Sequence, residues 1–366
     1  MFSEVAYKNA DACRFCWMCR HLCPISLKTG KEINSARARG LLVSLVKRGE
    51  KYDETMAANM WECVLCGACT DDCATGYEPR IYIREGRSLA IAEGLAPKNV
   101  MEVVEKYLEH GNMYGKENLQ ENLAADVAAL PEPAEVLLYV GEVASVEAPE
   151  IARAAMNLLR KAGVSFTVLK GEPASGACMG DMIGFVDEVK QQGVALSRAI
   201  AASGAKVVVA LDGMDARILK HVYKEWNCAP KADVLTATTY FAQLVAEGKL
   251  NLNKLEGTVS IHDAGALARD LDETAPVREL VAALGLTNVE LLRCKNLSKS
   301  CGGPLLKQYS PYLSGLTVQG RWEDLLRSDV RTLVTESPAS YATLGSKIPE
   351  GCVLEDVILL LDKASN

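Results

Sequence analysis

Apolar residues recur at helical intervals through the first third of the chain, and this pattern predicts an all-helical region. The expected helices cover Ser35–Lys47, Glu54–Trp61, Tyr82–Glu93 and Pro97–Glu109. The stretch Gly111–Gly115 interrupts the pattern, and Pro131-Glu132-Pro133 is typical of a boundary between domains.

From residue 135 onward, short apolar runs that are typical of buried strands alternate with helical patterns. The expected strands are Glu135–Val140, Val164–Lys170, Lys206–Leu211, Thr258–His262, Val289–Leu292 and Thr332–Thr335. Helices are expected between them, including Ala148–Ala162 and Ala275–Leu284. This alternation favours Rossmann-like parallel sheets.

The α/β region contains two similar units. Ala148-Pro149 opens a helix in the first unit, and Ala275-Pro276 opens one 127 residues later. At a similar offset, Ala177-Cys178 in the first unit corresponds to Ser300-Cys301 in the second. We therefore predict an internal duplication and three domains, which cover residues 1–130, 134–252 and 256–366.

Composition and charge narrow the class of protein. With 49% hydrophobic and 24% charged residues, the 366-residue chain can form packed cores, and its net charge of −7 argues against general nucleic-acid binding. No run approaches 18 apolar residues, so we expect no transmembrane helix. The first 25 residues lack a signal-peptide core, and we expect a cytoplasmic protein.

The distribution of cysteine is the strongest chemical signal. Of 13 cysteines, eight lie within residues 13–73, in two runs of the form C-x2-C-x2-C-x3-C. This is the spacing of two-cluster bacterial ferredoxins, in which the fourth cysteine of each run ligates the other [4Fe–4S] cluster. The spacing predicts a first cluster site of Cys13, Cys16, Cys19 and Cys73, and a second cluster site of Cys63, Cys66, Cys69 and Cys23.

Other uses of these cysteines fit less well. The cytosol keeps thiols reduced, which argues against disulfides. Structural zinc prefers two CxxC pairs per site, and two runs of four cysteines depart from that pattern. Only the first run is followed by proline, at Pro24, whereas Ala74 follows the second; this proline is not a ligand.

The 39 residues between the runs contain the first two expected helices, which favours an all-α ferredoxin module over the β-type. Residues 1–45 carry seven Lys or Arg but three Asp or Glu. Two interpretations of this basic segment stay open: a docking face for an acidic redox partner, or compensation of the negative charge of the clusters.

Taken together, these motifs resemble a known family. Residues 1–125 are similar to the C subunit of heterodisulfide reductase, and to the iron–sulfur subunits of glycolate oxidase and anaerobic glycerol-3-phosphate dehydrogenase. Residues 135–366 resemble the duplicated cysteine-rich (CCG) domain of the B subunit, through Gly141 and Ser145, His262-Asp263, Arg269-Asp270 and Cys301-Gly302-Gly303.

Departures from the family carry as much information as the matches. The resemblance implies five cysteines per repeat, which bind a noncubane iron–sulfur cluster. The corresponding residues here are Glu142, Cys178, Met179, Asp212 and Asp215 in the first repeat, and Gly265, Ser300, Cys301, Ser337 and Ser340 in the second. Because two of ten cysteines remain, we expect no noncubane cluster.

The residues at these ten positions allow other kinds of site in place of the cluster. Glu142, Asp212 and Asp215 could hold a hard cation or form a hydrogen-bonded remnant, and Cys178 and Cys301 could pair as a redox disulfide. His262-Asp263 resembles a general-base pair, but we favour a structural role. No phosphate-binding glycine motif appears, so we expect no flavin or nucleotide on this chain.

The sequence thus predicts an electron-transfer iron–sulfur subunit of a multisubunit oxidoreductase. Two [4Fe–4S] clusters would relay single electrons between a flavoprotein and another acceptor, with the C-terminal domain as a scaffold. We expect no catalysis by this chain alone, no catalytic residue, and membrane association only through a partner. The alternative is a disulfide-reductase-type catalytic subunit with its active site in the C-terminal domain.

Overall fold

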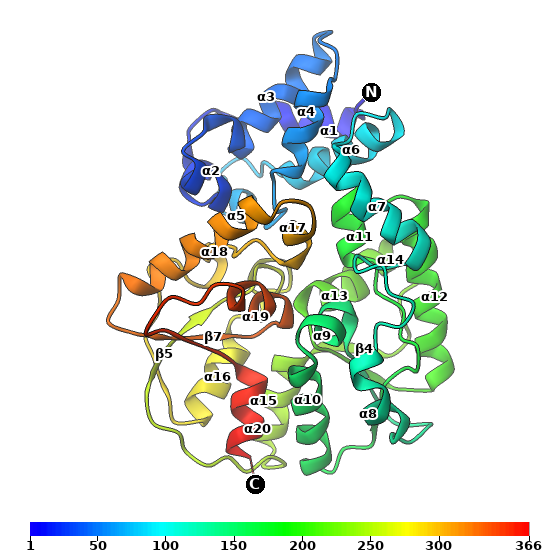
Figure 1. The fold of residues 1–366 in the computed structure, drawn as a ribbon, viewed down its shortest axis with the longest axis vertical. Coiled ribbons are helices and arrows are strands. Elements are labelled where there is room, and N and C mark those ends of the chain that lie inside the picture. Colours follow the sequence, from blue (N-terminus) through cyan, green and yellow to red (C-terminus); the bar gives the residue numbers. More distant parts are fainter. Residues whose placement is uncertain (366) are drawn as a thin grey trace.

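The structure, a computed structural model, describes residues 1–365. The first third is helical, as expected, and its helices extend from one end of the molecule along the side of the α/β region (Figure 1). They are α1 (Glu4–Asp11), η1 (Met18–His21), α2 (Pro24–Thr29), η2 (Glu32–Asn34), α3 (Ala36–Lys47), α4 (Glu54–Trp61), α5 (Ala68–Asp71), α6 (Pro79–Ala92), α7 (Lys98–His110), η3 (Glu121–Leu123) and α8 (Ala124–Ala128).

Local capping explains where the helices between the cysteine runs begin. The Ser35 side chain accepts a hydrogen bond from the Ala38 amide at the start of α3, and Asp53 accepts one from Met56 at the start of α4. The helix α7 ends at Gly111, which has a φ of +70°. The four helices predicted in this region therefore agree with the structure to within three residues at each end.

Two four-stranded parallel sheets form the rest of the chain. The first contains β1 (Val136–Tyr139), β2 (Phe166–Thr167), β3 (Val207–Ala210) and β4 (Asp233–Thr236), in the order β2-β1-β3-β4. The second contains β5 (Thr258–His262), β6 (Thr287–Asn288), β7 (Thr332–Thr335) and β8 (Val353–Asp356), in the order β6-β5-β7-β8. The same strand order in both sheets supports the predicted duplication.

The helices of the first repeat are α9 (Gly141–Glu147), α10 (Pro149–Lys161), α11 (Ala177–Ile183), α12 (Asp187–Ser203), α13 (Gly213–Arg217), η4 (Ile218–Val222), α14 (Tyr223–Glu225) and α15 (Ala237–Ala246). Those of the second are η5 (Ala266–Asp270), α16 (Ala275–Ala283), η6 (Lys295–Leu297), α17 (Pro304–Tyr309), α18 (Pro311–Leu326), α19 (Pro338–Gly345) and α20 (Val357–Ala364). Helix α10 packs on α20, and α15 packs on α16. One apolar core includes residues of both sheets.

The strand predictions failed at sheet edges. The run Val289–Leu292 is not a strand: the strand β6 ends at Asn288, and Leu292 is 89% exposed. The edge strands β4 and β8 were missed. Each has few buried apolar residues, because an edge strand is only half covered, so the apolar pattern that identifies central strands is weak there.

The helical region packs directly on the α/β region. Helix α6 contacts α11, α7 contacts α17, and α2 contacts α18 (Figure 1). Within residues 1–365, no helix is both long and apolar enough to cross a membrane.

Candidate iron–sulfur site

The two cysteine runs form loops with the same backbone shape. In the first loop, Phe15 and Trp17 have φ values of +56° and +69°; in the second, the equivalent Leu65 and Gly67 have +50° and +74°. Left-handed backbone is uncommon at non-glycine residues and persists only where the surroundings impose it. Here it turns the Phe15 amide toward the Cys13 sulfur at 3.4 Å, and the Leu65 amide toward the Cys63 sulfur at 3.3 Å.

The last cysteine of each run lies beside a different kind of segment. Cys23 caps α2, where its sulfur accepts a hydrogen bond from the Ser26 amide at 3.4 Å. Pro24 occupies the first position of that helix, which suits its fixed φ and missing amide proton. No helix starts directly after Cys73, so nothing favours a proline there, and this explains the difference between the two runs.

The eight cysteines gather in two groups that mix the runs. Cys23, Cys63, Cys66 and Cys69 line one small cavity. The thiols that raise the pKa of Cys19, after burial, are those of Cys13, Cys16 and Cys73. Each group therefore takes three thiols from one run and the fourth from the other.

The chemistry of these thiols suits a metal centre. Burial raises the pKa of Cys23 to about 12, although Arg39 opposes the shift, and burial raises that of Cys69 well above its usual value. Burial also raises the pKa of Cys66, and buried thiols with raised pKa values do not ionise by themselves at neutral pH. They fit a group whose iron cations replace the thiol protons.

The two loops differ in exposure. Around the first loop, Cys16 is exposed, and Phe15, Trp17 and Met18 are 51%, 43% and 49% exposed. The guanidinium of Arg37 lies 3.9 Å from the centre of the Trp17 ring. In the second loop, Leu65 is buried. The first cluster site is thus close to the surface, whereas the second lies between the helical and α/β regions.

A cavity of about 110 Å3 separates the second loop from the α/β repeats. Cys63 and Cys66 line one side. The other side is formed by segments that follow the carboxyl ends of β3, β5 and β7, where ligand sites of parallel sheets commonly occur. Seven of the ten positions compared with the family line it, five replaced and two that keep cysteine: Asp212, Gly265, Ser300, Ser337 and Ser340, with Cys178 and Cys301.

The three carboxylates proposed as a cation site have other partners. Glu142 accepts hydrogen bonds from the Tyr107 hydroxyl at 3.2 Å and the Met113 amide at 3.1 Å. Asp212 accepts from the Ser337 hydroxyl and the Ala339 amide, and Asp215 accepts from Ser175. Among residues 1–365, no group of three or more His, Cys, Asp and Glu is arranged to hold a single metal ion. The three carboxylates are thus hydrogen-bonded to different neighbouring residues.

The two remaining candidate pairs are Cys178 with Cys301, which line the same cavity, and His262 with Asp263. Cys178 and Cys301 are both buried and free. The Nδ1 atom of His262 accepts a hydrogen bond from Arg321, and burial lowers the pKa of His262 well below its usual value. Asp263 instead binds Arg278 at 2.7 Å and the Lys295 amide. The side chains of His262 and Asp263 thus bind different neighbouring residues and not each other. This arrangement favours a structural role for the two residues over a general-base pair.

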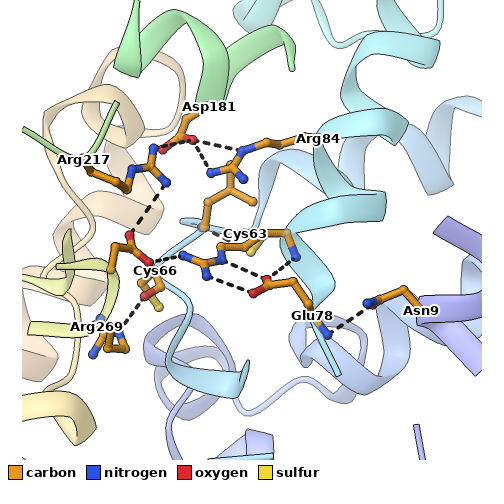
Figure 2. A network of polar contacts seen from close by, with 11 residues as sticks. Asn9, Cys63, Cys66, Glu78, Arg84, Asp181, Arg217 and Arg269 are labelled. Atoms are coloured by element: carbon orange, nitrogen blue, oxygen red, sulfur yellow. Dashed lines mark hydrogen bonds and ion pairs between the residues drawn. The ribbon is translucent and has the colours of Figure 1, made fainter. Parts of the chain in front are cut away.

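Sequence reasoning missed a set of arginines around the second loop. Arg87 donates to the Met60, Cys63 and Asp181 carbonyls, and Arg269 donates to the Cys66 carbonyl. Ion pairs continue this network: Asp181 pairs with Arg84 and Arg217 (Figure 2), and Asp270 pairs with Arg217 and Arg80. A signal existed: residues 80, 84 and 87 are spaced to share one face of α6.

Comparisons with known proteins agree with this geometry. A family model described as a 4Fe-4S dicluster domain matches residues 9–77. The chain is 29% identical over 260 residues to a probable membrane-anchored ferredoxin of Chromohalobacter salexigens, and 25% identical over 263 residues to the probable iron-sulfur-binding oxidoreductase FadF of Bacillus subtilis. These matches cover 68% and 66% of this chain but only 38% and 37% of those proteins.

A third relative matches along nearly its full length. It is a subunit of the dihydromethanophenazine:CoB–CoM heterodisulfide reductase of Methanosarcina acetivorans. The two chains are 24% identical over 402 residues, which cover 99% of this chain and 95% of the relative. The dicluster match and these relatives together support an iron–sulfur protein that is similar to heterodisulfide reductase subunits.

Proposed function

We propose that this chain is an electron-transfer subunit of a multisubunit oxidoreductase, with two [4Fe–4S] clusters. Cys13, Cys16, Cys19 and Cys73 would hold the first cluster, and Cys23, Cys63, Cys66 and Cys69 the second. When bound, such a cluster supplies one-electron transfer. The observation that carries the proposal is the gathering of eight thiols into two groups of four, each drawn from both runs.

The chain's own residues give the two sites different roles. The exposed Phe15, Trp17 and Met18, with Arg20 and Arg37 beside the Trp17 ring, offer an apolar and basic surface next to the first site. Such a surface suits a redox partner with an acidic rim, for which we propose a flavoprotein. Leu65 and Trp61 shield the second site from water. We place the complex in the cytoplasm, with any membrane contact made by a partner.

The α/β region would then act as a scaffold of two CCG-type repeats, within the proposed boundaries 134–252 and 256–366. Ser, Gly, Met and carboxylate side chains cannot replace the bridging thiolates of a noncubane cluster. The alternative, a disulfide-reductase active site in this region, draws support from the name of the Methanosarcina relative and from Cys178 and Cys301 in the cavity.

The test compares metal content and EPR spectra of anaerobically purified protein. We expect about eight irons per chain and two reduced [4Fe–4S] signals. Cys73→Ala should remove the same signal as Cys16→Ala, and Cys23→Ala the same signal as Cys66→Ala. Cys228→Ala, outside both runs, is the control and should keep both signals.

Three results would contradict the proposal. If Cys73→Ala removed the signal that Cys66→Ala removes, the crossed ligation would be wrong. A wild-type content near four irons would exclude the two-cluster relay. An additional signal from the oxidised protein would favour the disulfide-reductase alternative.

A further inference from the structure

We infer that Arg269, a residue of the second α/β repeat, is a positioning residue that raises the reduction potential of the second cluster site above that of the first. The inference rests on the proposed function and adds a direction to it: electrons would settle at the site beside the cavity. It also gives the α/β region a role that requires no ligand of its own.

The contacts of Arg269 leave its charge without a direct counter-ion. Its Nε donates to the Cys66 carbonyl at 2.7 Å, and its Nη1 donates to the Asn296 and Ser298 carbonyls, both at 2.9 Å. Within the described part of the chain, no carboxylate forms an ion pair with it. Its neighbour Asp270 pairs with Arg80 at 2.7 Å instead. The Nη2 atom is buried and has no hydrogen-bond partner.

The Nη2 atom of Arg269 lies against Gly265. A Cβ atom added to Gly265 would overlap it and would lie 3.5 Å from the Cys66 carbonyl oxygen. Gly265 occupies one of the replaced cysteine positions. The guanidinium therefore fills the space beside a lost ligand and reaches from there to the loop that holds Cys66.

Among residues 1–365, the arginines beside the first site are either exposed, as Arg14 is, or paired with a carboxylate. The nearby Arg37 and Arg20 share the carboxylate of Glu32, at 2.7 and 3.8 Å, and both arginines are partly exposed. By contrast, Arg39 lies behind Cys23, is 1% exposed, and binds only the Asn34 and Asn59 carbonyls. The second site thus faces three guanidinium groups that pair with no carboxylate among residues 1–365, those of Arg39, Arg87 and Arg269, and the ones beside the first site are more exposed to solvent or share a carboxylate.

This difference acts on electron transfer through charge. One electron leaves the reduced first site and enters the oxidised second site, so the second site gains one negative charge and no bond forms or breaks. A buried cation stabilises that added charge more than a screened one does. The reduced state of the second site is therefore favoured, and its potential is the higher of the two.

The test is an EPR-monitored redox titration of the cluster-loaded full chain. Arg269→Gln removes the charge, whereas Arg269→Lys keeps it. We expect Arg269→Gln to change the equilibrium constant for electron transfer between the two sites by at least tenfold. For a one-electron couple, this factor equals 59 mV. The shift should be toward lower potential, at the second site only. Arg160→Gln, which removes one charge from the distant helix α10, is the control.

A variant of opposite sign protects the test against misfolding. Asp270→Asn removes a negative charge beside the second loop, one that pairs with Arg80 and Arg217 while Glu78 stays paired with Arg80, so it should raise the potential of the second site. If Arg269→Gln binds less iron than the wild type, its midpoint cannot be compared, and the upward shift in the potential of Asp270→Asn becomes the test of whether local charge sets the potential of the second site.

The outcomes separate the inference from the proposed function. Two wild-type midpoints that neither variant moves, with iron content unchanged, would overturn the role of Arg269 while leaving the relay in place. A wild-type protein with a single midpoint and about four irons would instead overturn the relay itself.

Discussion

The ion pairs between the helical region and the first α/β repeat should make Asp181 a strong determinant of stability. The carboxylate of Asp181 lies in α11 and binds Arg84 of α6 at 2.8 Å, with Arg217 at 3.6 Å (Figure 2). Burial alone would raise the pKa of Asp181, but Arg84 and Arg217 hold it below its usual value. Asp181→Asn keeps the shape of the side chain and removes only its charge.

The expected cost follows from burial. The side chains of Arg84 and Asp181 are 15% and 12% exposed, so the substitution leaves a buried cation without its carboxylate. Breaking such a pair costs about 3–5 kcal/mol. The pair Asp126–Arg153 has a similar distance of 3.0 Å but is 36% and 44% exposed. Asp126→Asn should therefore cost about 0–1 kcal/mol and is the matched control.

The assay is thermal unfolding of the cluster-loaded protein, followed anaerobically by circular dichroism, with iron content measured for each variant. Asp181→Asn should unfold at a clearly lower temperature than Asp126→Asn. Adding Arg84→Met should restore part of the loss, because it removes the unpaired cation. Equal unfolding temperatures for the two single variants would refute the reasoning, since burial would then not matter to the strength of the pair.

Two further predictions concern pH and backbone shape. Burial raises the pKa of Asp356 from 3.8 to about 7, so the folded protein keeps a proton there that the unfolded chain loses. The free energy of unfolding of the wild type should therefore fall by up to about 4 kcal/mol relative to that of Asp356→Asn as pH rises from about 4 to about 7. If the unfolding free energies of the two proteins changed equally across that range, the raised pKa of the buried carboxyl would be wrong. Gly67→Ala should weaken iron binding at the second site, because φ is +74° and the new Cβ would lie 2.9 Å from Arg80 Nη1. Gly94→Ala, with a φ of +69° and open space, has only the backbone cost of about 1–2 kcal/mol, and equal iron loss in both variants would exclude a role for Arg80.

The local parts of the fold could be predicted because local sequence determines them. The helix Glu54–Trp61 and the strands Thr258–His262 and Thr332–Thr335 have the same bounds in the prediction and in the structure. Each has either a capping residue or a largely buried apolar run. The edge strands β4 and β8 were missed because they are only half covered and lack a largely buried apolar run.

The candidate cluster sites show the same division. The spacing of the eight cysteines suffices to predict their chemistry, since ligand geometry fixes the intervals within each loop. The surroundings of the sites depend on contacts between residues far apart in the chain. Arg269 reaches Cys66 across about 200 positions, and no local pattern identifies such a contact.

The sequence by itself thus determined the helical module and the two runs of four cysteines that we propose as cluster ligands, and its resemblance to a family implied the loss of eight of ten cysteines from the α/β repeats. The tertiary structure alone decided what those replaced positions became: a small cavity, a hydrogen-bonded set of carboxylates, and a guanidinium directed at the second loop. The physical reason is that backbone propensity and ligand spacing act over a few residues. Burial, ion pairing and local charge depend on which distant segments the fold brings together.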